Sequence, residues 1–142
     1  MRILLKSKVN SPIDKVNDHF DEGLFKYLLP PGAELIHYGG SSKGDIVHLK
    51  LPVVGTWKSE ITDHGRNNGS IYFVDEGIKL PFPLTRWKHK HILHQIDNQA
   101  IIEDNIEFST GLVLSDALVY PFLYLAFAPR IKQYKKYFAK LQ

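Results

Sequence analysis

The chain has 142 residues, of which 44% are hydrophobic and 23% charged, a composition that suits one folded domain, residues 1–142. Its net charge of +3 is dispersed among acidic residues and forms no dense basic stripe, so nucleic acid is not an expected partner. The lack of cysteine excludes disulfides and thiolate sites. Because the apolar stretch Ile3–Leu5 is too short for the core of a signal peptide, we expect a cytoplasmic protein.

The first segment alternates apolar and polar residues from Ile3 to Val9, which predicts a strand with one buried face. Ser11 is expected to cap a helix whose first residue is Pro12, since proline needs no amide partner there. Gly23 is expected to end that helix. A shorter helical segment, Leu24–Leu29, should follow.

Turn residues then divide the chain into short runs rich in β-forming residues. These predicted strands are Glu34–Tyr38, Asp45–Leu51, Thr56–His64, Ser70–Ile78, Arg86–Ile96 and Gln99–Ser109. Connections this short require antiparallel neighbours, because a parallel crossover needs a dozen residues or more. Together with the first strand, they predict a seven-stranded antiparallel sheet.

The last segment, Ser115–Gln142, is apolar in its first half and basic with helically spaced apolar residues in its second half. This pattern predicts one long C-terminal helix. Pro121 and Pro129 should kink it or divide it in two, because an interior proline removes a backbone hydrogen bond. The apolar run is shorter than the roughly 20 residues that span a bilayer, so we expect a helix packed on the core and no membrane partner.

The order of one strand, two helices, a six-strand meander and a long helix resembles the helix-grip fold of the START-like, pollen-allergen-like SRPBCC superfamily. The segments Trp87–His91 and Ile102–Phe108 resemble two strands of its bacterial branch of ligand-binding and cyclase/dehydrase-like proteins, and Pro129–Tyr134 resembles the closing helix. This resemblance implies an α+β fold in which a curved sheet wraps around the C-terminal helix. It also implies an apolar cavity between them that holds a small hydrophobic molecule.

Side chains two residues apart on a strand share a face, so polar residues are expected on the buried face of the last two strands. A two-residue turn at Asp97-Asn98 would place His91 opposite Asp104, close enough for a hydrogen bond. The predicted ligand-binding wall consists of Trp87, His89, His91, Asp104, Ile106 and Phe108 from the strands and Phe122, Leu125 and Tyr134 from the helix.

His91 and Asp104 have three interpretations: a buried polar pair that satisfies itself, a pair that orients a ligand, or a general acid/base pair. His89 and His91 also have the spacing of zinc ligands on a strand. The third ligand would then be Asp104 or one of three distant histidines, His37, His48 and His64. We predict no metal and no other cofactor.

The expected function is therefore the binding, for transport or sequestration, of a small hydrophobic molecule without any reaction. One alternative is a cyclase or dehydratase with His91 and Asp104 as catalytic residues. Another is a non-catalytic scaffold whose cavity is filled by its own aromatic side chains. The sequence leaves the identity of the ligand and the oligomeric state open.

Overall fold

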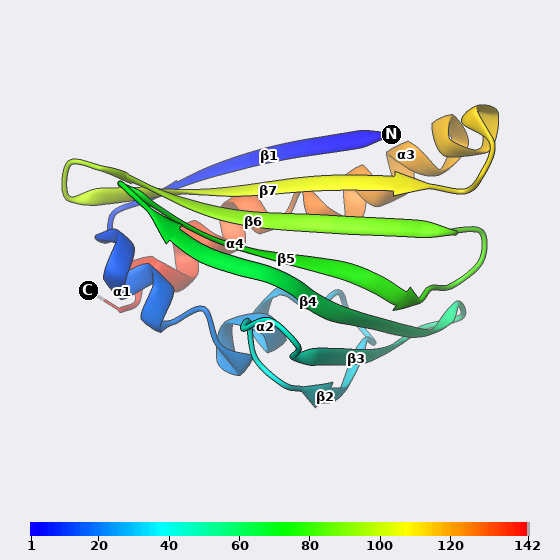
Figure 1. The fold of residues 1–142 in the computed structure, drawn as a ribbon, viewed down its shortest axis with the longest axis horizontal. Coiled ribbons are helices and arrows are strands. Elements are labelled where there is room, and N and C mark those ends of the chain that lie inside the picture. Colours follow the sequence, from blue (N-terminus) through cyan, green and yellow to red (C-terminus); the bar gives the residue numbers. More distant parts are fainter. Residues whose placement is uncertain (142) are drawn as a thin grey trace.

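The structure, a computed structural model, describes residues 1–141. One antiparallel sheet contains β1 (Arg2–Val9), β2 (Glu34–Tyr38), β3 (Ile46–Leu51), β4 (Gly55–Asn67), β5 (Ser70–Lys79), β6 (Arg86–Ile96) and β7 (Gln99–Ser109). The strand order is β1-β7-β6-β5-β4-β3-β2, so β2 to β7 form a meander and β1 pairs with β7 at one edge (Figure 1). The predicted seven-stranded sheet is thus confirmed.

Irregular pairing gives this sheet its curvature. The register shifts once in β2, between Leu35 and His37, and twice in the β4 pairing with β5, next to Ser59 and between Ile61 and Asp63. Each bulge adds a residue to one strand, which bends it and increases its twist. Figure 1 shows the helices α3 (Val113–Phe127) and α4 (Arg130–Ala139) running along one face of the curved sheet.

The helix α1 (Ile13–Asp18) begins one residue later than predicted, and Ser11 does not cap it. Pro12 occupies the N-cap position, and the backbone N–H of Ile13 donates to the side-chain oxygen of Gln95 at 2.8 Å. Gln95 of β6 therefore supplies the acceptor that was expected from Ser11. This contact also fixes α1 to the end of β6.

The helix α2 (Glu22–Leu28) begins before Gly23, which was expected to end the preceding helix. The side chain of Asp21 accepts a hydrogen bond from the backbone N–H of Leu24 at 3.0 Å. A carboxylate at this position satisfies a free amide and complements the positive end of the helix dipole. Asp21 therefore caps a second helix that includes Gly23, the residue predicted to end the first helix.

The C-terminal segment consists of two helices that meet at Ala128 and Pro129. Pro121 lies inside α3 and does not end it. Pro129 stands at the N-terminus of α4, a position that tolerates the missing amide hydrogen. Among residues 1–141, no helix has the length and apolarity required to cross a membrane.

Two apolar clusters form the core. The first gathers around α4 and contains Val9, Ile13, Val16, Leu24, Leu28, Leu93, Ala100, Ile102, Tyr134 and Phe138. The second lies against α3 and contains Ile3, Leu5, Leu84, Trp87, Ile106 and Phe108. On β6, His89 and His91 lie between Trp87 of one cluster and Leu93 of the other. A polar cluster therefore separates two apolar ones.

Candidate functional site

A cavity of about 190 Å³ lies between the sheet, α2 and α3. Its wall is mainly apolar and includes Leu24, Leu28, Val47, Ile61, Phe73, Leu123 and Phe127. Both tryptophans of the chain, Trp57 and Trp87, also line it and meet edge to face with ring centroids 4.6 Å apart. Apolar walls with a few polar groups are typical of small-molecule sites.

The six strand residues predicted to face inward are all buried, but only three of them reach the cavity. Trp87, His89 and His91 line it. Ile106 and Phe108 do not, and they belong to the apolar cluster against which α3 packs. Asp104 is fully buried beyond the two histidines and is not part of the cavity wall.

The three predicted helix residues do not line the cavity. Phe122 and Leu125 are 75% and 69% exposed, and Tyr134 is buried in the α4 cluster. The cavity wall instead receives Leu123, Ala126 and Phe127 from α3. Because α3 is apolar on nearly every side, its sequence pattern did not show which side would face the sheet.

Asp75 of β5 also lines the cavity, although it was not among the predicted site residues. Its Oδ1 accepts a hydrogen bond from Nε1–H of Trp87 at 3.1 Å, and its Oδ2 lies 3.3 Å from Nε2 of His91. Phe73, two residues earlier on the same strand, also lines the cavity. Since residues two apart share a strand face, an inward Phe73 would have predicted an inward Asp75.

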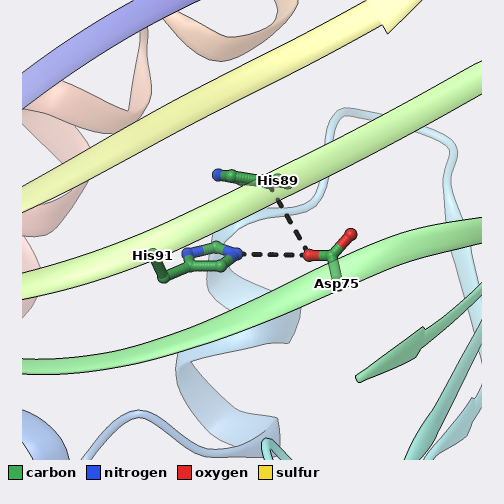
Figure 2. A group of neighbouring side chains, drawn as sticks. All are labelled: Asp75, His89 and His91. Carbon is green, nitrogen blue, oxygen red and sulfur yellow. Dashed lines mark hydrogen bonds and ion pairs between the residues drawn. The ribbon is translucent and has the colours of Figure 1, made fainter. Parts of the chain in front are cut away.

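The two histidines bind the two carboxylates in a crossed pattern. His89 faces Asp75 and His91 faces Asp104 across the strand ladders. However, Nε2 of His89 lies 2.8 Å from Oδ1 of Asp104, while His91 is hydrogen-bonded to Asp75. The imidazole rings stack with centroids 3.8 Å apart. Figure 2 shows that both direct a ring nitrogen towards the same oxygen of Asp75.

The predicted register of His91 opposite Asp104 is confirmed, whereas the hydrogen bond that this register allows is not formed. Nδ1 of His91 lies 3.3 Å from Oδ1 of Asp104, yet it makes no hydrogen bond with any described residue. From α4, the hydroxyl of Tyr134 donates to Oδ1 of Asp104 at 3.4 Å, and a guanidinium nitrogen of Arg130 lies 3.7 Å away. Asp104 thus connects β6 with α4.

The electrostatics of this cluster give its members different proton affinities. Burial alone would raise the pKa of each carboxyl, but the contacts with His89 and His91 outweigh it and lower the pKa of both Asp75 and Asp104. Burial, and then the charge of His91, lower the pKa of His89 to about 4. Burial also opposes the charged form of His91, but contacts with Asp104 and Asp75 raise its pKa. His89 is therefore neutral at pH 7.

Comparison with known proteins shows similarity of structure rather than of sequence. No family model matches the sequence, and no curated protein is significantly similar to it. An uncharacterized protein from Bacillus thuringiensis superposes with a TM-score of 0.67 at 17% identity, covering 98% of this chain and 99% of that one. The protein XoxI from Bacillus cereus gives 0.69 at 16% identity, covering 99% and 96%.

A third similar structure is norcoclaurine synthase from Thalictrum flavum in complex with dopamine and hydroxybenzaldehyde. It gives a TM-score of 0.63 at 18% identity and covers 92% of this chain and 83% of that one. Together with the curved seven-stranded sheet and its C-terminal helices, these neighbours show that the chain has the helix-grip fold.

Proposed function

We propose that this protein binds a small, mainly apolar molecule in the cavity between the sheet, α2 and α3. The observation that carries this proposal is the open space of about 190 Å³ inside the fold. For comparison, an apolar protein cavity of about 150 Å³ accommodates benzene. The size therefore favours a ligand with one ring or a short aliphatic chain.

The arrangement of polar groups suggests how such a ligand is oriented. His91 and Asp75 lie in the wall beside Trp87, whereas Leu24, Leu28 and Ile61 supply apolar surface. A ligand with a hydroxyl or carbonyl group at one end can hydrogen-bond to the polar side and bury its remaining surface against the apolar one. The dopamine and hydroxybenzaldehyde bound by the synthase of similar fold are one-ring compounds with such groups.

A second candidate function is acid/base catalysis, as in a cyclase or dehydratase. The observation in its favour is the 3.3 Å contact between His91 and Asp75 in the cavity wall. A carboxylate that orients an imidazole is suited to proton transfer. In this arrangement Asp75 replaces Asp104 as the expected partner of His91.

Intrinsic fluorescence tests ligand binding directly, because both tryptophans line the cavity. Mass spectrometry under native conditions, on protein purified from its own host, should first show whether a small molecule co-purifies. A panel of phenols, benzyl alcohols and short aliphatic alcohols is then titrated while tryptophan emission is followed. We expect a saturable change. The absence of both a co-purifying mass and any saturable change would refute the proposal.

A further inference from the structure

The cavity wall contains three side chains whose ligand atoms converge on one point. These atoms are Nδ1 of His89, Nε2 of His91 and Oδ2 of Asp75, and all lie within 4.8 Å of one another. The carboxylate oxygen is 3.3 Å from the His91 nitrogen and 3.8 Å from the His89 nitrogen. In a tetrahedral zinc site, with bonds of about 2.1 Å, neighbouring ligand atoms are about 3.4 Å apart. The two distances to the carboxylate oxygen differ from this value by a few tenths of an ångström, and the two ring nitrogens lie within 4.8 Å of each other.

The hydrogen bond between His89 and Asp104 leaves the converging nitrogen of His89 available, whereas the converging atoms of His91 and Asp75 are bonded to each other. When Nε2–H of His89 donates to Asp104 at 2.8 Å, the neutral ring carries its lone pair on Nδ1. That lone pair faces Oδ2 of Asp75 at 3.8 Å, so two electron-rich atoms oppose each other with no hydrogen between them. A cation placed between them would turn this unfavourable contact into two favourable ones.

The residues behind the converging atoms have the arrangement that supports metal ligands. Asp104 lies at the far nitrogen of both rings, 2.8 Å from His89 and 3.3 Å from His91. The second oxygen of Asp75 is held by Trp87. In metal sites, a carboxylate that pairs with the far nitrogen of a histidine fixes the ring orientation, and the free oxygen of a ligating carboxylate is itself hydrogen-bonded.

The charges in the cluster also leave room for a cation. A fully buried carboxylate, Asp104, and a partly buried one, Asp75, belong to this cluster, and the guanidinium of Arg130 pairs with Asp104. An uncompensated charge in the interior is costly, so the cluster requires a further positive charge. A proton on His91 meets this requirement as well, and it is the competing occupant that an experiment has to exclude.

We propose that Asp75, His89 and His91 bind a zinc-class divalent cation, with Asp104 and Trp87 orienting the three ligands. The donor set of two imidazoles and one carboxylate suits this class of metal. Because all three ligands line the cavity, the fourth coordination position would face it and could accept water or an oxygen of a bound molecule. The proposal does not require the ligand binding proposed above, since protein atoms alone hold the ion.

The test uses the full chain, dialysed against a chelator and then titrated with Zn²⁺ or Co²⁺ alone. We expect one Zn²⁺ per chain by calorimetry and elemental analysis, and visible absorption bands of low-symmetry Co²⁺. Asp75→Asn and His91→Ala should weaken Zn²⁺ binding by about 100-fold or more, and Asp104→Asn by about 10- to 100-fold. His94→Ala is the matched control, because His94 lies on the same strand and contacts Glu103 instead; it should bind normally.

Wild-type protein gives an independent measurement if a variant fails to fold. Nitrogen-detected NMR of the histidine rings should show Zn²⁺ perturbing Nδ1 of His89 and Nε2 of His91. No uptake by the wild type, or equal uptake by Asp75→Asn and His94→Ala, would overturn the proposal and leave a proton as the occupant. Tryptophan titrations of the metal-free protein separate this failure from a failure of ligand binding.

Discussion

His89 donates a hydrogen bond to Asp104 at 2.8 Å along a diagonal of the β6–β7 ladder. His91, which directly faces Asp104, instead turns to Asp75 on the strand at the other side. Diagonal neighbours on a sheet lie within reach of long side chains, so both arrangements are accessible to the same backbone. The crossed bonds tie β6 to both of its neighbouring strands in the middle of the sheet.

We first predict that Asp104→Ala destabilises the fold by about 3–5 kcal/mol, because it removes one side of a buried, hydrogen-bonded charge cluster. Arg130 and the two histidines would lose their common partner. Urea unfolding followed by circular dichroism measures the effect. Asp18→Ala, at an exposed position of α1, is the control. A loss below about 1 kcal/mol for Asp104→Ala would contradict the importance of this cluster.

A second prediction concerns the space in the cavity. Ser59 is a small, buried residue of the wall, so Ser59→Leu should fill part of the cavity and weaken ligand binding by about tenfold or more, or about 1.4 kcal/mol. Phe122→Ser, which changes an exposed residue of α3, should leave the affinity unchanged. Tryptophan fluorescence titration of both variants decides the matter. Weakening by Phe122→Ser alone would place the binding site on the outer face of α3.

The prolines of the C-terminal segment should respond differently to replacement. Pro121→Ala restores a backbone N–H inside α3 and should stabilise the protein by about 1–3 kcal/mol. Pro129→Ala should have a smaller effect, because a residue at the start of a helix loses no internal hydrogen bond through proline. Thermal and urea unfolding of both variants test this order. Equal changes in stability for the two variants would show that Pro121 does not destabilise α3.

The ionisation of Asp116 should make the free energy of unfolding depend on pH. The backbone N–H and then the hydroxyl of Thr110 lower the pKa of Asp116 below its usual value, and the N-terminal ammonium of Met1 acts in the same direction. Asp116 lines a surface groove together with Arg2, Arg86 and Glu107. A carboxyl whose pKa is lower in the folded protein stabilises the fold above its unfolded pKa of about 3.9 and ceases to do so as the pH falls through the folded value.

The measurement is the unfolding free energy of the wild type and of Asp116→Asn at several pH values. We expect a constant advantage of the wild type between about pH 5 and 7, followed by a decline below about pH 4. A difference that is the same at pH 3 and pH 7 would show that the ionised form of Asp116 does not contribute.

The strand pattern of this chain was largely predictable because two local signals agree. Alternation with a period of two identifies the buried face of β6 and β7, and the two-residue turn after Ile96 sets their register. Together they place His91 opposite Asp104 correctly. They do not determine which carboxylate each imidazole binds, because that choice depends on side-chain rotamers and on Asp75 from a third strand.

The side of α3 that faces the sheet could not be predicted from the sequence. Apolar residues lie on nearly every side of α3. Hydrophobicity therefore does not distinguish Leu123, which lines the cavity, from Phe122, which is exposed. The start of α1 was misplaced for a different reason. The acceptor for its first amide comes from Gln95, which is distant in sequence.

The bulge between Leu35 and His37 makes the edge strand β2 a poor template for pairing with a strand of another chain. β2 is the outermost strand on its side, is only five residues long, and pairs irregularly with β3. A short, distorted edge offers another chain few consecutive peptide groups for pairing, so strand-to-strand aggregation is discouraged there.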